Sequence, residues 1–410
     1  MIFSGHRALK FLMCILLGLA SFAAAADSTR ARDLGIPFEG QPGALNAITD
    51  VAGVEVGQVT LIKRDGVLQV GIGPVRTGVT VIHPRGKNSL DPVFADWFTL
   101  NGSGEMTGTT WLEERGLIDG PIAITNTHSV GVVRDASVAW MVQQGWPADW
   151  HAPVVAETYD GGLNDINGFH VTREHALEAM AKTTSGPVEE GVVGGGTGMV
   201  CNGFKGGIGT ASRQFEQGGK HFTVGVLVQC NYNWSGQGLR LGGLAVETLL
   251  PVGKHCFTDR SIERHVDWYP YCENEPVQVV EEPVRDGSII IVVATDAPLL
   301  PHQLHRLAKR PSLALGRLGS VSSDGSGDIF VAFSTANMGK VSENDFSTVE
   351  MYPNNELTIV FTATVQATEE AIVNAMVAAH TVIGASGLRV EALPEDQVRA
   401  LFAPKPGQQQ

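Results

Sequence analysis

The sequence of 410 residues has few cysteines, few aromatic residues and few charges for its length. The five cysteines show no spacing typical of a zinc site, and aromatic and charged residues make up only 7% and 18% of the chain. The net charge is −14 and no long basic run occurs, which argues against nucleic acid and anionic membrane surfaces as partners. Hydrophobic residues make up 43% of the chain, so a packed core is expected rather than wholesale disorder.

The first residues have the pattern of a targeting segment. Three basic side chains precede an apolar run over residues 11–22, and a stretch of four alanines ends at Ala26. The apolar run is short for a membrane span, and no later segment reaches that length without charges. We therefore expect a cleaved secretory signal over residues 1–26 and a periplasmic or secreted mature protein of residues 27–410, without further contact with the membrane. An uncleaved anchor is the alternative.

Four cysteines remain after the signal is removed, because Cys14 lies inside it. An exported protein can hold disulfides. Cys256 and Cys272 bracket a polar, aromatic segment that a disulfide between them would close. Cys201 and Cys230 lie in apolar stretches, which favours two buried thiols.

Two patterns that resemble ligand sites fail on their spacing. The glycine-dense runs over residues 191–199 and 206–209 lack the Gly-Lys-Ser/Thr ending and the βαβ context of nucleotide-binding loops. The first run can instead present bare backbone N–H groups to an oxyanion. His170 and His175 are five residues apart, so they share a helix face poorly and do not favour a metal pair.

Strand and helix patterns are mixed along the chain. Strands are expected over residues 47–59, 78–84, 120–127, 153–158, 222–229, 289–293, 329–334 and 356–364, and helices over 109–115, 135–144, 172–183, 301–315 and 369–383. Thr368 is the expected N-cap of the last helix. Residues 253–283 are charged, aromatic and irregular, which indicates an exposed loop. Because the elements follow no regular βαβ rhythm, α+β layers are predicted rather than a doubly wound sheet.

The rest of the chain is organised around the stretch over residues 286–298. Ser288 stands between a polar turn and an apolar, β-branched run that is typical of a strand buried on both faces. Its hydroxyl is therefore mounted on a rigid element, as a reactive group requires. A chain that cuts itself before this serine would gain a free amine, which titrates near neutral pH and can serve as the base. A turn before a core strand is the structural alternative.

Other polar side chains also lie at strand ends. Asn231 follows one expected strand, and Ser326 and Asp328 precede another. No Gly-x-Ser-x-Gly elbow and no His-Glu-x-x-His motif occurs, which argues against an α/β-hydrolase and a zincin. The twelve histidines are scattered, so a Ser-His-Asp triad stays open at this level.

Several motifs resemble the DmpA/BapA family of self-cleaving L-aminopeptidase/D-amidase-esterases and β-peptidyl aminopeptidases. The segments that carry the resemblance are residues 157–161, 163–167, 192–199, 203–212, 287–298 and 325–330. These motifs occur in the family's order, and the resemblance as a whole covers nearly all of the mature chain. The resemblance implies a four-layer αββα sandwich, cleavage at Gly287-Ser288 into chains 27–287 and 288–410, and no metal or organic cofactor.

The resemblance also implies roles for individual residues. Ser288 becomes the new N-terminus and the nucleophile. Ser326 and Asp328 match the family's Ser-x-acid pair, in which some members have Glu. Asn231 matches an asparagine assigned to oxyanion binding, and Tyr159 falls where an aromatic residue, often Trp, lines the substrate pocket. Each of these residues also has a structural alternative as a strand cap, a turn residue or a core side chain.

The sequence is therefore interpreted as an exported, self-processed aminopeptidase that forms a homo-oligomer of α/β heterodimers. It would release N-terminal residues from short peptides, amides or esters through an acyl-Ser288 intermediate. An acyltransferase like the ornithine acetyltransferases, which use threonine, is the first alternative, and a non-enzymatic exported binding protein is the second. Residues 253–282 depart from the compact family pattern and can alter access to the site.

Overall fold

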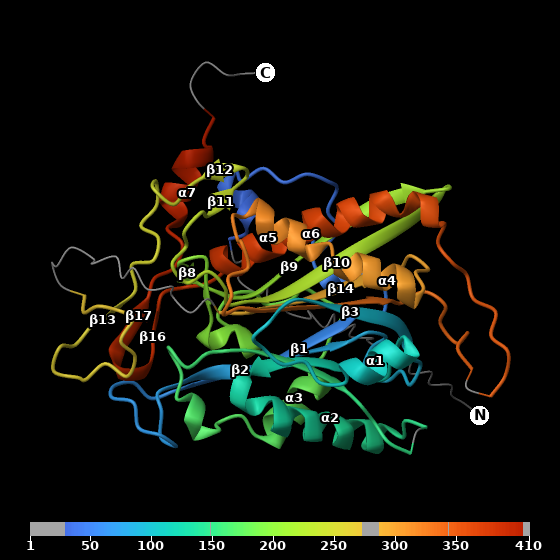
Figure 1. The fold of residues 1–410 in the computed structure, drawn as a ribbon, viewed down its shortest axis with the longest axis horizontal. Coiled ribbons are helices and arrows are strands. Elements are labelled where there is room, and N and C mark those ends of the chain that lie inside the picture. Colours follow the sequence, from blue (N-terminus) through green and yellow to red (C-terminus); the bar gives the residue numbers. More distant parts are fainter. Residues whose placement is uncertain (1–28, 148, 273–286, 343, 405–410) are drawn as a thin grey trace, which may run out of the picture.

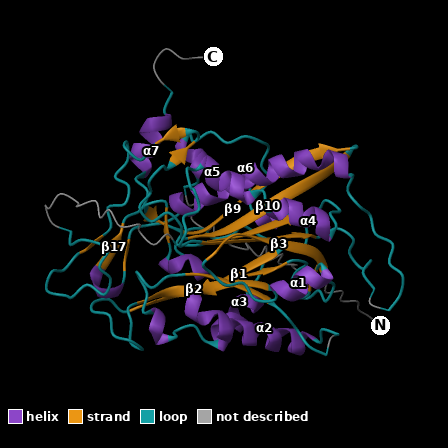
Figure 2. Cartoon of the chain, viewed as in Figure 1, coloured by secondary structure: helices purple, strands orange, loops and turns teal. Residues whose placement is uncertain are grey.

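The computed structural model describes residues 29–147, 149–272, 287–342 and 344–404. Two sheets face each other, and helices cover the outer face of each (Figure 1; Figure 2 shows the same view by secondary structure). This arrangement confirms the predicted four-layer αββα sandwich. The expected signal segment lies outside the described residues. Within the described ranges, no helix has the length and apolar character needed to cross a membrane.

The smaller of the two sheets has four strands in the order β1-β2-β5-β6. Their bounds are β1 Glu55–Lys63, β2 Val75–His83, β5 Ile122–Asn126 and β6 Val154–Thr158. Its outer face is covered by α2 (Val130–Gln144) and α3 (Arg173–Ala181). The strand predicted over residues 47–59 is wrong in its first half, because Ile48–Asp50 forms a 3-10 turn.

The larger sheet has six strands in the order β4-β3-β15-β14-β10-β9. Their bounds are β3 Val93–Gly102, β4 Leu117–Ile118, β9 Gly207–Gln217, β10 Lys220–Cys230, β14 Ile289–Thr295 and β15 Gly327–Ser334. The helices α4 (Pro301–Ala308), α5 (Pro311–Arg317) and α6 (Leu357–Val377) lie on its outer side, and α1 (Thr109–Arg115) packs beside β3.

The central strand β14 is buried along its whole length, as the sequence predicted. Ile289, Ile291 and Val293 belong to the core shared with the outer helices. Ile290 and Val292 belong to the core between the two sheets. Because side chains alternate along a strand, one apolar run supplies both cores.

The prediction for residues 356–383 is wrong in three respects. Residues 357–364 belong to α6 rather than to a strand, and Thr368 lies inside that helix rather than at its N-cap. The helix also ends at Val377 rather than at residue 383, and Val382–Ile383 forms the short strand β16. The β-branched residues of this segment favour a strand locally, but the helix buries one long apolar face against β9 and β10. The hydroxyls of Thr364 and Thr368 donate to carbonyls four residues earlier, which accommodates them in the helix.

Short elements complete the fold at the ends of the sandwich. They are β7 Val200–Cys201 with β8 Phe204–Lys205, β11 Arg240–Leu241 with β12 Leu244–Ala245, the sheet of β13 Cys256–Phe257, β17 Leu388–Val390 and β16 Val382–Ile383, and the helix α7 Glu395–Phe402. The three-stranded sheet lies at one end of the sandwich (left in Figure 1).

The segment predicted as an exposed loop over residues 253–283 is only partly so. Its described portion, which ends at residue 272, contributes β13 and buries Phe257 and Tyr269. Cys256 and Cys272 form a disulfide, as the sequence suggested. Phe257, Trp268, Tyr269 and Tyr271 pack together in this portion, which the Cys256–Cys272 disulfide closes. Residues 273–283 lie outside the described residues.

Candidate active site

Strand register brings the polar residues together at one end of the central strands β15, β14 and β10 of the six-stranded sheet. Ile289 of β14 lies opposite Cys230 on the antiparallel strand β10 and opposite Asp328 on the parallel strand β15. The residue before Ile289 is Ser288, and the residue after Cys230 is Asn231. Three segments that are far apart in the chain therefore meet around the Ser288 hydroxyl.

Ser288 is held from two sides at the start of β14. Its carbonyl oxygen accepts a hydrogen bond from the backbone N–H of Asn231 at 3.1 Å. Its Oγ accepts a hydrogen bond from the backbone N–H of Gly327, also at 3.1 Å. The residue is 5% exposed, so the hydroxyl sits on a rigid strand with little access to bulk water. This mounting suits a nucleophile.

Ser326 and Asp328 flank the glycine that contacts Ser288. The Ser326 hydroxyl donates to Asp328 Oδ2 at 3.0 Å, and both residues are almost fully buried. Asn101, at the end of β3, donates from Nδ2 to Ser326 Oγ at 3.1 Å. The two side chains, two positions apart in the chain, are therefore hydrogen-bonded to each other, and their role stays a prediction. Asn101 was not singled out, because only the register of β3 with β15 reveals its position.

The Asn231 side chain is fully buried and held at both ends. Its Oδ1 accepts a hydrogen bond from the Val200 N–H, and its Nδ2 donates to the Tyr159 carbonyl, each at 2.8 Å. The Trp234 indole N–H donates to the Asn231 carbonyl at 3.1 Å. A Cβ atom on Gly287 would lie 2.8 Å from Asn231 Nδ2 and 1.8 Å from its carbonyl oxygen. Position 287 therefore admits only glycine and lies directly against this amide.

Tyr159 brings the smaller sheet into the same region, since it follows β6. Its ring stacks on Trp234 with centroids 6.2 Å apart, and Trp234 lies 6.4 Å from Trp268. Tyr159 is half-buried, and Trp268 belongs to the segment closed by Cys256–Cys272. The atypical segment therefore supplies part of the aromatic cluster beside the site.

A buried carboxylate that the sequence interpretation left without a role lies nearby. Glu157 Oε1 accepts the backbone N–H of Glu105 at 3.0 Å, and Oε2 accepts the Thr127 hydroxyl. Burial raises the pKa of Glu157, although these hydrogen bonds oppose the shift. A Cβ atom on Gly104 would contact both Glu157 Oε1, at 3.2 Å, and the Cα of Gly327, at 3.3 Å. Only the packing of the two sheets brings this carboxylate near the site.

The glycine-dense run over residues 191–199 does not support the oxyanion role considered for it. The N–H groups of Gly194 and Gly195 already donate to the hydroxyls of Thr60 and Thr80, at 2.8 and 3.1 Å. A side chain on Gly195 would collide with a neighbouring glutamine at 2.1 Å. The run is therefore glycine-rich because it packs closely between the sheets.

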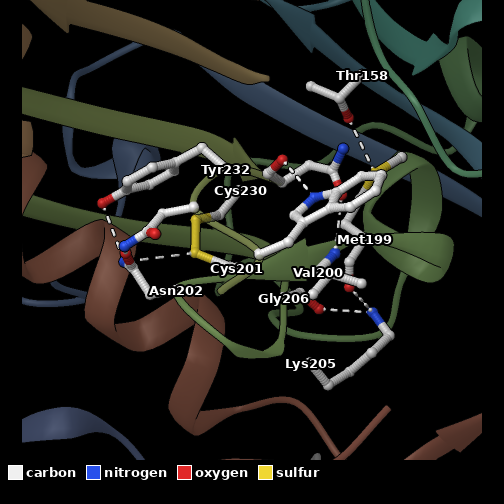
Figure 3. Close-up of a disulfide and its surroundings, with 12 residues drawn as sticks. Thr158, Met199, Val200, Cys201, Asn202, Lys205, Gly206, Cys230 and Tyr232 are labelled. Atoms are coloured by element: carbon white, nitrogen blue, oxygen red, sulfur yellow. Dashed lines mark hydrogen bonds between the residues drawn. A yellow bond between two sulfur atoms is a disulfide. The ribbon is translucent and has the colours of Figure 1, made fainter. Parts of the chain in front are cut away.

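The prediction of two free thiols at Cys201 and Cys230 is wrong, because the structure joins them in a disulfide (Figure 3). Their Cα atoms lie 5.5 Å apart although 29 positions separate them in the chain. An apolar pattern around a cysteine predicts that it is buried, but not which cysteine it pairs with. Cys201 and Cys230 meet only because β7 folds against the end of β10. The bond links the neighbours of Val200 and Asn231.

The arrangement suits acyl transfer by a serine. A buried hydroxyl lies at the start of a strand, the Asn231 amide lies against the preceding residue, and a hydrogen-bonded serine and aspartate lie on the neighbouring strand. Within the described ranges, no group of three His, Cys, Asp or Glu side chains has a geometry suited to a metal ion. His170 pairs instead with Asp165 at 2.8 Å.

Fold and site together define a serine hydrolase built on an αββα sandwich. The family model described as peptidase family S58 matches residues 46–390, and the chain belongs to this family. It is accordingly a serine aminopeptidase or amidase.

Similar proteins agree with this assignment. The β-peptidyl aminopeptidase BapA of Sphingosinicella microcystinivorans is 57% identical, over 96% of this chain and 97% of its own length. BapA of Sphingosinicella xenopeptidilytica is 43% identical over 96% of each chain. The solved structure of the L-aminopeptidase D-Ala-esterase/amidase from Ochrobactrum anthropi, a variant of the Ntn hydrolase fold, superposes with a TM-score of 0.79. It shares 44% identity over 91% of this chain and 98% of that one.

Proposed function

We propose that the protein is an exported β-peptidyl aminopeptidase that cuts itself between Gly287 and Ser288. The cut enzyme would hydrolyse N-terminal residues from short peptides, amides or esters through an acyl-Ser288 intermediate. The observation that carries the proposal is the position of Ser288 at the start of β14, after Gly287, which packs against the Asn231 side chain, with its Oγ held by the Gly327 N–H. The preference for β-amino acids rests on the similarity to the two BapA proteins.

Self-cleavage would begin with attack of Ser288 Oγ on the carbonyl carbon of Gly287. The bond from that carbon to the Ser288 nitrogen breaks, which leaves an ester on Oγ and a free amine on Ser288. Water then hydrolyses the ester, releasing the Gly287 carboxylate and restoring the hydroxyl. The tight packing of Gly287 against Asn231 supports this step, because an amide donor that lies against Gly287 would stabilise the negative charge on its carbonyl oxygen.

In turnover, the free α-amine of Ser288 would act as the base. It would accept the proton of Oγ as that oxygen attacks the substrate carbonyl, and pass the proton to the departing amine. Asn231 would stabilise the oxyanion. The buried Ser326–Asp328 pair would favour the ammonium form of Ser288 between these proton transfers. Water would then release the acyl group from Ser288.

Glu157 is the proposed partner of the substrate's own ammonium group. An enzyme that requires a free N-terminus needs a negative charge at a fixed distance from its nucleophile. Glu157 lies across Gly104 from Gly327, whose N–H contacts Ser288 Oγ. Tyr159 and Trp234 would contact the substrate side chain or its neighbouring residue.

Export and assembly are part of the same proposal. Residues 1–26 would be removed as a secretory signal, leaving a periplasmic or secreted enzyme of α/β heterodimers that associate further. A pair of disulfides is consistent with an oxidising compartment. Small peptides and amides would be its partners, rather than nucleic acid or a membrane.

A denaturing gel with N-terminal sequencing tests the proposal directly. The smaller piece should begin Ser-Ile-Ile-Ile, and the cut enzyme should release p-nitroaniline from a β-homoalanyl anilide. An intact chain without hydrolysis would favour the binding protein. Transfer of acetyl from acetylornithine to glutamate, without hydrolysis of the anilide, would favour the acyltransferase.

A further inference from the structure

A lysine with no role in the proposed reaction lies behind Asn231. Lys205, on β8, is fully buried, and its Nζ donates to three backbone carbonyls. They are those of Met199 and Gly206, each at 2.7 Å (Figure 3), and of Gly196 at 3.3 Å. Among the described residues, no ion pair joins Lys205 to a carboxylate. A buried ammonium bound only to peptide groups is unusual, because buried charges are normally paired.

The number of contacts matches the charged form of the side chain. An ammonium group has three N–H donors and no acceptor, and here three carbonyl oxygens surround it. A neutral amine would direct its lone pair at one of these oxygens. Burial lowers the pKa of Lys205 to about 7, because it disfavours the charged form. The three carbonyl oxygens act in the opposite direction, since they accept hydrogen bonds from the ammonium form.

One of these carbonyls connects Lys205 to Asn231. The Met199 carbonyl and the Val200 N–H belong to the same peptide group. Lys205 donates to that carbonyl at 2.7 Å, and the Val200 N–H donates to Asn231 Oδ1 at 2.8 Å. The hydrogen bonds therefore run in one direction from the ammonium, through one peptide group, to the Asn231 amide.

Hydrogen bonds in such a chain polarise one another. A charged donor on a carbonyl makes the N–H of the same peptide a stronger donor, and that N–H in turn withdraws electron density from the Asn231 amide oxygen. The Nδ2–H groups of Asn231 then become stronger donors. One of them bonds the Tyr159 carbonyl, and Nδ2 lies against Gly287, where the attacked carbonyl stands during self-cleavage.

We propose that Lys205 is a positioning residue for oxyanion stabilisation, acting on Asn231 through the Met199–Val200 peptide group. The Cys201–Cys230 disulfide holds the same two segments, since it joins the residue after Val200 to the residue before Asn231. The inference rests on the proposed acyl-serine reaction and adds a charge that strengthens its oxyanion donor. A purely structural lysine would satisfy the three carbonyls without affecting the transition state.

The test is Lys205→Met, with Lys205→Gln as a second neutral variant that keeps donor groups. Lys87→Met is the matched control, because Lys87 Nζ also donates to two carbonyls, those of Ala181 and Thr183, and is not among the site residues. Each protein is first checked for folding and for the cut before Ser288. The measurements are kcat and KM on a β-homoalanyl anilide, and the affinities for β-homoalanine and for its aldehyde, which forms a tetrahedral adduct with serine.

We expect kcat of the Lys205 variants to fall about 10-fold or more, towards the 10²–10³-fold loss typical of a deleted oxyanion donor. Affinity for the aldehyde should fall by a similar factor, while KM and the affinity for β-homoalanine stay within about twofold. Lys87→Met should match the wild type. A folded variant that fails to cut itself would also support the role, because the cut passes through the same kind of oxyanion.

Wild-type kcat in a cleaved Lys205 variant would overturn the inference. Equal losses in affinity for the aldehyde and for β-homoalanine would do the same. If neither variant folds while Lys87→Met does, Lys205 is a structural residue and the inference is also wrong. A wild-type enzyme that neither cuts itself nor hydrolyses the anilide would instead refute the proposed function.

Discussion

Two of the buried cations, Arg213 and Lys205, are held in different ways. Arg213, on β9, donates to Glu370 of α6 at 2.6 Å, and both side chains are 1% exposed. Glu370 also accepts hydrogen bonds from Arg32 at 2.7 Å and from Asn46 at 2.6 Å. This arm cluster of Arg32, Asn46, Arg213 and Glu370 fastens the N-terminal segment to α6. Lys205, near Ser288, is bound by peptide carbonyls instead.

The difference shows how partners separate a structural charge from a functional one. In the arm cluster the Glu370 carboxylate lies directly against both guanidinium groups and offsets part of their charge, and the result is attachment of the arm. At Lys205 no carboxylate of the described residues offsets the charge, and the ammonium group polarises the Met199–Val200 peptide group, whose N–H donates to Asn231. We therefore expect changes near Ser288 to alter rate and changes in the arm cluster to alter stability.

The largest effect on rate is expected for Ser288→Ala. Without the hydroxyl neither the cut nor an acyl-enzyme can form, so the protein should stay one chain and show no turnover. Its melting temperature should stay close to that of the wild type, because the strand and the arm cluster are untouched. A gel, a turnover assay and a melting curve suffice. Cleavage or activity in this variant would remove Ser288 from the mechanism.

The next largest effect is expected for Asp328→Asn. Loss of the carboxylate should lower kcat/KM on an aminoacyl anilide by roughly 10²-fold or more, the scale of a lost acid–base partner. Ser326→Ala should lose a comparable amount, and the double variant little more, because the two residues are hydrogen-bonded and act as one unit. Near wild-type turnover in cleaved Asp328→Asn would identify the pair as a structural turn.

Glu370→Gln should separate stability from rate. Removing one partner of a buried ion pair typically costs about 3–5 kcal/mol of unfolding free energy, whereas kcat of the folded enzyme should hardly change. Denaturant titration and turnover on the same preparation give both values. A loss of kcat without loss of stability would contradict the proposed division between the two regions.

The pH dependence of stability should change in the same variant. Burial alone would raise the pKa of Glu370, but its contacts with Arg32, Arg213 and Asn46 outweigh burial and lower it below 4.5. A lowered carboxyl pKa stabilises the fold above about pH 4.5 and loses that contribution as the pH falls. Wild-type unfolding free energy should therefore decrease on acidification below pH 4.5 more steeply than that of Glu370→Gln.

The smallest effect on rate is expected from opening the peripheral disulfide. Replacing Cys256 and Cys272 by serine should lower the unfolding free energy by about 3 kcal/mol in the chain-entropy model. It should leave kcat nearly unchanged, because the described part of the segment reaches the aromatic cluster beside the site through Trp268, which lies 6.4 Å from Trp234, and not through Ser288 itself. Mass spectrometry that finds free thiols at both positions in the purified protein would contradict the bond itself.

Much of the site could be read from local pattern. The apolar run after Ser288 specifies β14 by its own hydrophobicity, and Asn231, Ser326 and Asp328 stand out as polar residues at strand ends. The motifs around them were enough to identify the family and the four layers. These features are encoded within short stretches of chain, so no long-range contact is needed to recognise them.

What only the tertiary structure decided depends on contacts between distant segments. A β-branched stretch becomes part of α6 because the sheet buries it, and Cys201 meets Cys230 because β7 folds against β10. Lys205 likewise acquires its place behind Asn231 from the pairing of β7 with β8, which sets Lys205 opposite Val200. Local sequence determines which groups are available and which segments are apolar. Strand register and packing determine which of those groups touch, because they depend on all segments at once.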